Sequence, residues 1–129
     1  MVRILSAAMA AVFALAVVVQ FNDPDPLRWM IIYGAACALS TWAALRRSVP
    51  VAIASVVAVI ALAWALALGS RVYGLVMPGE LVQAWEMKDE RVELAREAGG
   101  LLIVSAWLLS LAGHSWHLGR QSPTSRIRK

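Results

Sequence analysis

The chain has 129 residues, of which 60% are apolar and 16% charged. Soluble domains carry about a quarter charged residues, so this composition excludes an ordinary soluble domain, and the length favours a single domain over residues 1–129. The formal net charge is +4 and Cys37 is the one cysteine, so an intramolecular disulfide or a cluster of thiolate metal ligands is excluded.

Four long uncharged runs follow one another along the chain. Each is close to the ~17–25 residues that a helix needs to cross a bilayer. We therefore predict an all-α fold, an integral membrane four-helix bundle with spans at about 4–20, 29–45, 49–68 and 101–118. The first run has no small-x-small cleavage site after it, so we interpret it as a retained helix rather than as a signal peptide.

The first connection, residues 20–28, reads QFNDPDPLR and is short and stiff. Its two prolines fix their own φ and bias the preceding Asp23 and Asp25 to extended conformations. Two interpretations stay open. Asn22 or Asp23 caps the next helix or starts a turn, or the loop binds a ligand such as a hard cation, which prefers oxygen ligands.

Small residues recur every four positions in three of the spans. They are Ser6, Ala10 and Ala14 in the first, Gly34 and Ala38 in the second, and Ala54 and Ala58 in the third. This spacing lets helix backbones approach closely in lipid, so we expect a compact bundle without a wide pore. Trp29, Tyr33 and Tyr73 near one membrane interface, and Trp42 and Trp116 near the other, are typical of aromatic belts.

The connection between the third and fourth spans, residues 69–100, is too long for a simple turn and is expected to have structure of its own. We predict an extra amphipathic extramembrane helix at about 79–98, beginning after a proline that suits a first turn. Gly99 and Gly100 then either end this helix or let it pivot into the last span. Four glutamates spaced +4, +3 and +4 lie on one face of it: Glu86, Glu90, Glu93 and Glu97.

This glutamate stripe has two interpretations. It is a solvated face, or it faces something positive: Arg28 or Arg71 within the chain, or a divalent cation, a cationic ligand or a basic partner surface. Like charges at this spacing destabilise an isolated helix by a few tenths of a kcal/mol per pair.

The charges sort by side of the membrane. Seven basic residues, including Arg3, Arg46, Arg47 and those of the tail, fall on one side, and all eight acids fall on the other with five basic residues. The positive-inside rule then places both termini in the cytoplasm, and we expect a bacterial inner membrane. The basic tail can lie on anionic lipid, so no nucleic-acid partner is needed to explain it.

The motifs QFNDPDPLRWMIIYG, from Gln20, and EMKDERVELAREAGGLLI, from Glu86, together resemble the transmembrane protein 220 family. The resemblance implies four spans and the positions of these two motifs within them. It implies no catalytic activity. It points to eight positions to test, namely Asn22, Asp23, Asp25, Trp29, Glu86, Arg91, Glu93 and Glu97.

Two functional hypotheses follow. The first is a non-enzymatic accessory or scaffold protein whose acidic outer face docks a partner. The second is a binding or catalytic site for a divalent cation or a polar lipid headgroup, with Asp23, Asp25 and Glu90 as weak metal candidates. The full candidate set is Asn22, Asp23, Asp25, Trp29, Tyr33, Glu86, Glu90, Arg91, Glu93 and Glu97.

The first hypothesis is favoured because the sequence contains no catalytic constellation. No serine has a histidine and an acid on its side of the membrane, and there is no phosphate-binding glycine loop. His114 and His117 share a helical face, but no acid or cysteine on that side completes a metal site. We expect no cofactor. The lipid bilayer is the expected partner, with a membrane protein as a possible second, and the sequence leaves the oligomeric state open.

Overall fold

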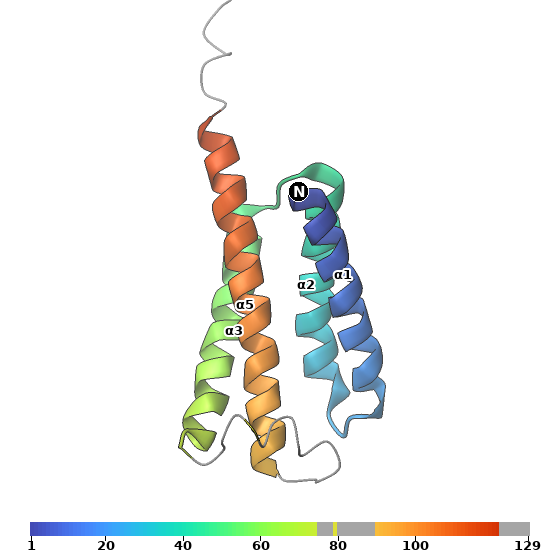
Figure 1. Cartoon of the computed structure of the whole chain (residues 1–129), viewed down its shortest axis with the longest axis vertical. Helices are drawn as coiled ribbons and strands as arrows, with labels where there is room; N and C mark the ends of the chain where they lie inside the picture. The colour runs from blue at the N-terminus through green and yellow to red at the C-terminus, as the bar shows by residue number, and fades with distance from the viewer. Residues whose placement is uncertain (75–78, 80–89, 122–129) are drawn as a thin grey trace, which may run out of the picture.

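The computed structural model describes residues 1–74, 79 and 90–121. Within these residues the fold is all-helical and contains no strand. The four long helices are α1 (Val2–Val19), α2 (Pro26–Arg46), α3 (Val51–Val72) and α5 (Glu90–Arg120), and a short 3-10 helix, η1 (Gln20–Asn22), follows α1. The long helices run side by side along the long axis of the molecule (Figure 1).

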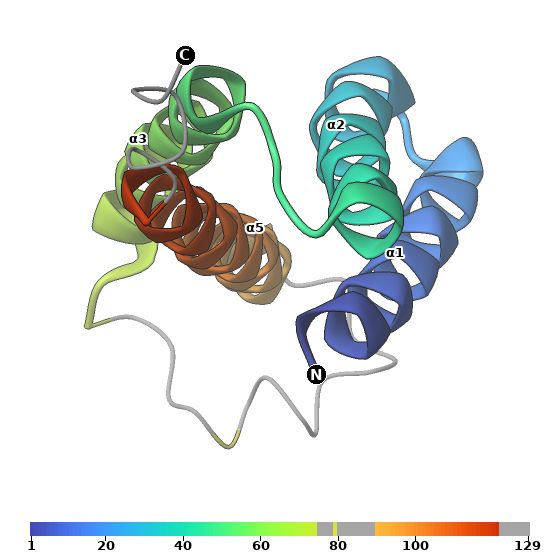
Figure 2. The ribbon, with the colours of Figure 1, turned by 90° about the horizontal axis from the view of Figure 1, so that it is seen from above.

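The helices are arranged as two pairs. The helix α1 packs along α2, and α3 packs along α5, with fewer contacts between the pairs (Figure 2). Because consecutive helices alternate in direction, one end of the bundle holds the start of α1, the turn from α2 to α3 and the end of α5. We call this the basic end. The opposite end, with η1 and the starts of α2 and α5, is the acidic end.

Three helical segments are long and apolar enough to cross a membrane, namely Val2–Asn22, Val51–Val72 and Glu90–Arg120. The helix α5 has 31 residues and is about 46 Å long at 1.5 Å per residue. The hydrocarbon core of a bilayer is only about 30 Å thick. All the acids of α5 lie between Glu90 and Glu97, so this charged first part extends beyond the hydrocarbon.

The extra helix predicted at 79–98 is not seen as a separate element in the described residues. Residues 90–98 form the first turns of α5, and the helix continues through Gly99 and Gly100 without a break. Backbone hydrogen bonds that continue across the two glycines explain this, since glycine weakens a helix but does not stop it. Residues 80–89 lie outside the described part of the chain.

Small residues form the buried face of α3. Ala54, Ala58, Ala61 and Ala65 are all buried, and they face the larger buried side chains of α5, among them Leu101, Val104 and Leu108. Alanines opposite leucines let the two backbones approach closely, which is how dispersion packing holds helices together in lipid. The prediction for Ala54 and Ala58 is thus confirmed. The prediction for the second span is wrong, because Ala38 is exposed and α2 uses Ala36 and Ala43 instead.

Hydrogen bonds from side chains join the two pairs. The indole Nε1 of Trp107 in α5 donates to Ser40 Oγ in α2 at 2.9 Å, and Ser40 Oγ donates to the Ala36 carbonyl at 2.7 Å. Near the basic end, the Val49 backbone N–H donates to Ser115 Oγ at 2.8 Å. These bonds keep α2 and the following turn in contact with α5 where side-chain packing between the pairs is sparser.

Candidate binding site at the acidic end

The Asn-Asp-Pro-Asp loop makes a compact corner between α1 and α2. Asp23 follows η1 with extended backbone angles (φ −82°, ψ 146°), and its N–H donates to the Gln20 carbonyl at 3.0 Å. Asp25 precedes α2 at the N-cap position, with Pro26 in the first turn, but its carboxylate makes no capping hydrogen bond. The structure therefore does not support side-chain capping of α2 by this loop.

The Asp25 carboxylate instead forms an ion pair with Arg28, one turn into α2, and both side chains are more than half exposed. Exposed ion pairs contribute between about zero and 1 kcal/mol to stability. The pair therefore orients the two side chains more than it stabilises the fold. The Arg28 guanidinium also lies over the ring of Trp64 in α3, 6.0 Å from the ring centroid, so Arg28 spans from one helix pair to the other.

A cluster of aromatic rings lies directly beneath these charges. Trp29 is only 4% exposed and stacks on Trp64, with ring centroids 4.7 Å apart. Tyr33 is 8% exposed and stacks between Trp29 at 6.3 Å and Phe13 of α1 at 6.5 Å. Such ring pairs contribute about 0.5–1.5 kcal/mol beyond the area they bury. The cluster joins α1, α2 and α3, so the interpretation of Trp29 and Tyr33 as lipid-facing belt residues is wrong.

Tyr33 also reaches α5. A Cβ placed on Gly100 would lie 2.2 Å from the Tyr33 hydroxyl oxygen, closer than any real contact. Gly100 is therefore the position at which α5 makes room for Tyr33, and all four long helices meet at this aromatic cluster.

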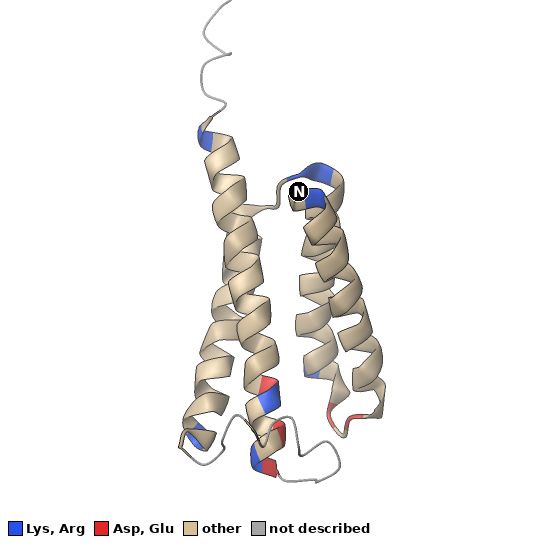
Figure 3. Cartoon of the chain, in the orientation of Figure 1, with Lys and Arg blue, Asp and Glu red and all other residues tan. Residues whose placement is uncertain are grey.

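Carboxylates from two separate segments gather above the rings. Burial raises the pKa of Glu97, the nearby Glu93 and Asp23 raise it further, and Arg28 opposes them. Glu97 also interacts electrostatically with Tyr33. A half-buried carboxyl close to two other carboxyls is strained when all are ionised, because like charges disfavour the ionised form. The described acids all gather at this end of the bundle (Figure 3).

The structure brings together part of the predicted set. Asp23, Glu93 and Glu97 interact through their charges, and Trp29 and Tyr33 lie in the layer below them. The remaining described candidates, Asn22, Asp25, Glu90 and Arg91, have exposed side chains at the same end. The predicted residue Glu86 lies outside the described residues.

Three residues of this site were not predicted from the sequence: Phe13, Trp64 and Gly100. Trp64 had a usable signal, since it is a large ring in an otherwise alanine-rich run. Gly100 had a weaker signal, because it belongs to a pair of adjacent glycines. For metal binding, no group of three or more His, Cys, Asp or Glu residues within the described ranges is arranged to hold an ion. The weak metal candidates Asp23, Asp25 and Glu90 stay a prediction, because Glu80, Glu86 and Asp89 lie outside those ranges.

Long apolar helices, with charges confined to their two ends, define an integral membrane protein built as a helical bundle. The chain belongs to the family described as "Transmembrane family 220, helix", whose model matches residues 12–113. The matched range contains the Asp-Pro loop, the aromatic cluster and the charged start of α5, so the resemblance seen in the sequence is confirmed. No solved structure matches the chain.

Proposed function

We propose that this protein is a non-enzymatic accessory protein of the membrane, and that its acidic end docks a basic segment of a partner protein. The observation that carries the proposal is that burial and the charges of Glu93 and Asp23 raise the pKa of Glu97 at the acidic end. Two segments far apart in sequence contribute to it. Holding like charges together weakens the fold, and a cationic partner would relieve that repulsion.

A basic polypeptide fits the described geometry better than a small ion does. The described carboxylates of the acidic end are partly to fully exposed and are distributed over the loop and the start of α5, so these carboxylates form a surface. Trp29 and Trp64 beneath them are already stacked and packed, and Arg28 already covers Trp64. Lysine and arginine side chains can reach such dispersed carboxylates individually.

The proposal includes a topology of four spans with both termini in the cytoplasm, in a bacterial inner membrane. Three spans are supported by length and apolarity. The fourth is α2, whose 21 residues are long enough to cross and which packs along α1 for most of its length. The positive-inside rule then assigns Arg3, Arg46 and Arg47 to the cytoplasm and the acidic end to the outside.

A divalent cation or a polar lipid headgroup at the same end is the second candidate. The charge of Asp23 supports it, because it raises the pKa of Glu97 from a different segment of the chain. Calorimetry with Mg²⁺ and Ca²⁺ on the full chain and on the Asp23→Asn and Glu97→Gln variants tests the cation. A heat of cation binding that is present in the full chain and absent from both variants would support this candidate over the docking surface. Identical isotherms for the full chain and the variants would rule it out.

Site-specific photo-crosslinking in native membranes tests the docking proposal. Leu27, at the acidic end of α2, and Leu45, at its other end, are matched positions because their side chains are 68% and 70% exposed. A crosslinker at Leu27 is expected to capture a protein through a lysine- or arginine-rich segment, identified by mass spectrometry of the linked peptide. A crosslinker at Leu45 is expected not to capture the same protein.

The same crosslinking in a variant with two neutralised carboxylates tests whether these carboxylates bind the partner. The Asp23→Asn/Glu97→Gln double variant is expected to reduce the adduct from Leu27 several-fold while the protein stays in the membrane at its normal level. An adduct of undiminished yield in the double variant, or equal adducts from both positions, would rule out docking through these carboxylates.

A further inference from the structure

Three basic side chains from three different elements line one cavity at the basic end. They are Arg3 of α1, Arg47 of the turn between α2 and α3, and His114 of α5. The cavity has a volume of about 350 Å³, and its remaining lining is apolar, from Met1, Val2 and Leu118. It lies at the opposite end of the bundle from the carboxylates, and the proposed docking function does not involve it.

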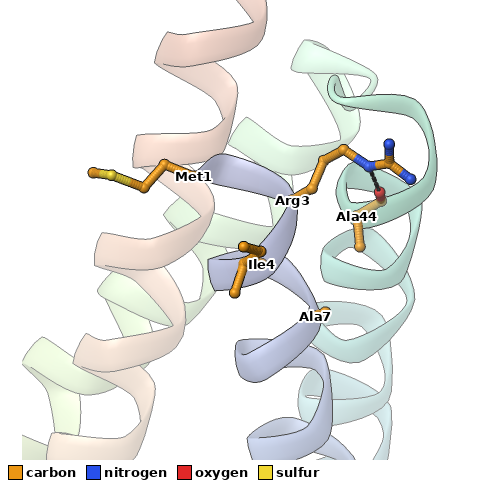
Figure 4. Close-up of a pocket in the computed structure, with 5 residues that line it drawn as sticks. All are labelled: Met1, Arg3, Ile4, Ala7 and Ala44. Carbon is orange, nitrogen blue, oxygen red and sulfur yellow. Dashed lines mark hydrogen bonds between the residues drawn. The ribbon is translucent and has the colours of Figure 1, made fainter.

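A hydrogen bond holds the side chain of Arg3, and another holds the backbone of Arg47. The Nε of Arg3 donates to the Ala44 carbonyl at 2.8 Å, which fixes the side chain across the last turn of α2 (Figure 4). Arg47 ends α2 in the left-handed region (φ 65°), and its N–H donates to the Ala43 carbonyl at 2.8 Å. Glycine is usual at this position of a helix end. A side chain there costs roughly 1–2 kcal/mol.

His114 is brought to the cavity by its neighbour. Ser115 accepts the hydrogen bond from the Val49 N–H, so α5 is tied to the turn that carries Arg47. His114 itself is half-buried on the cavity wall. The three residues border one space because specific hydrogen bonds join α1 to α2 and the turn to α5.

The charge of this cavity selects an anion. Every described aspartate and glutamate lies at the other end of the molecule, so no described carboxylate neutralises the two arginines (Figure 3). Arginine binds phosphate oxygens with two parallel N–H donors, so a phosphate group is an anion that suits this pair of arginines.

A second, more apolar groove lies next to the cavity, between α1 and α2. It has a volume of about 450 Å³ and is lined by Met1, Arg3, Ile4, Ala7 and Ala44 (Figure 4). Met1 and Arg3 border both spaces. A charged recess beside an apolar groove suits a molecule with an anionic head and a hydrocarbon chain.

The aromatic residues around the cavity indicate the depth at which it lies in the membrane. Trp42 and Trp116 are half exposed at this end, with Arg46 and Arg120 stacked on their rings at 5.8 and 4.1 Å. Tryptophan rings with adjacent cations are typical of the headgroup region of a bilayer. The cavity thus lies at the level where lipid phosphates are found.

We propose that the cavity bordered by Arg3, Arg47 and His114 binds the phosphate headgroup of one anionic phospholipid, whose acyl chain lies in the groove along Ile4, Ala7 and Ala44. The two arginines contact the phosphate oxygens, and the His114 imidazole donates a further hydrogen bond. The bound lipid would then bridge the two helix pairs at the end where the Val49–Ser115 hydrogen bond also joins them.

Native mass spectrometry of the full chain in detergent, titrated with phosphatidylglycerol or phosphatidylcholine, tests this site. The wild type is expected to retain one phosphatidylglycerol in preference to phosphatidylcholine. The Arg47→Gly variant removes a charge while easing the left-handed backbone, so it is expected to preserve the fold. It should weaken that preference about tenfold, the effect of losing one hydrogen bond to a charged group. The Arg3→Gln variant should have a similar effect.

Arg46→Gln is the matched control, since it removes an adjacent charge that lies outside the cavity, and it is expected to change the preference less than twofold. An Arg46→Gln loss equal to that of Arg47→Gly would show that only general surface charge attracts the lipid, and would overturn the site. Inorganic phosphate is added in a separate titration. Full displacement of the lipid by millimolar phosphate would identify a free-anion site and overturn the lipid assignment.

Discussion

The Tyr33 hydroxyl lies against Gly100 so closely that a Cβ on Gly100 would come within 2.2 Å of its oxygen. The ring cannot move aside freely, because it is stacked between Trp29 and Phe13. This contact sets the distance between α2 and α5 at the acidic end. It thereby determines how near Glu97, one turn before Gly100, lies to the loop that holds Asp23.

The first prediction concerns this contact. Gly100→Ala is expected to destabilise the protein by roughly 1–3 kcal/mol, the usual effect of overpacking. Gly99→Ala is the matched control, because a Cβ there meets nothing within 4 Å and alanine favours a helix over glycine by about 1 kcal/mol. Unfolding in mixed detergent measures both.

Tyr33→Phe removes the oxygen that the new Cβ would strike, so the Gly100→Ala/Tyr33→Phe double variant should recover most of the lost stability. Equal stability of Gly99→Ala and Gly100→Ala, or the absence of any rescue, would mean that the two helices do not approach as closely as described.

The second prediction contrasts two buried serines. Ser40→Ala leaves the Trp107 indole N–H without its acceptor and is expected to destabilise the protein by about 1 kcal/mol, or nearer 0.6 in the membrane. Ser6 is also fully buried, but its hydroxyl has no hydrogen-bond partner in the structure. Ser6→Ala removes that unsatisfied group, so it is expected to leave stability unchanged or to raise it.

The same unfolding measurement ranks the two serine variants. Trp107→Phe should make the Ser40→Ala substitution nearly neutral, since both partners of the bond are then gone. A larger loss from Ser6→Ala than from Ser40→Ala would contradict the hydrogen-bond assignment.

The third prediction is a dependence of stability on pH. Burial raises the pKa of Glu97 above the ordinary value of 4.5, with Glu93 and Asp23 adding to the effect and Arg28 opposing it. The folded protein therefore keeps the proton at pH values where the unfolded chain has lost it. The stability from this group is fully present below pH 4.5 and is lost as the pH rises through the raised folded value.

Thermal unfolding of the wild type and of Glu97→Gln between about pH 4 and pH 8 measures this effect. The variant should lack this component of the pH dependence and should be the more stable form near neutral pH. Glu90→Gln is the control, because Glu90 is exposed on the same helix. If Glu90→Gln reduced the pH dependence of stability as much as Glu97→Gln, the effect would come from the total charge of the helix and not from Glu97.

The fourth prediction concerns orientation in the membrane. Leu27→Cys and Gln121→Cys variants, each made with Cys37→Ala, place single thiols at exposed positions at opposite ends of the bundle. If the acidic end faces outward, a membrane-impermeant maleimide should label the Leu27→Cys variant in intact cells. The Gln121→Cys variant should be labelled only after permeabilisation, and the reverse pattern would invert the proposed topology.

Sequence patterns predicted the helices well. Each predicted span lies within one long helix, apart from Gln20 in η1 and from Val49 and Pro50 before α3. The reason is that a long apolar run in a membrane must satisfy its backbone groups internally, which a helix does. The packing faces were predicted less well: Ala54 and Ala58 are buried as expected, whereas α2 turns Ala36 and Ala43 inward rather than Ala38. Where nearly every residue is small or apolar, periodicity leaves the inward face undefined.

The candidate site shows the same division. The sequence by itself determined that the carboxyl groups collect at the ends of apolar helices, because hydrocarbon excludes charge, and it singled out Asp23, Glu93 and Glu97. Only the tertiary structure decided that the charges of Asp23 and Glu93 act on Glu97, that Trp29 and Tyr33 lie inside the bundle, and that Arg3 and Arg47 share a cavity with His114. Those relationships depend on how each helix is rotated about its axis, and contacts between distant segments, such as that of Tyr33 with Gly100, set the rotation.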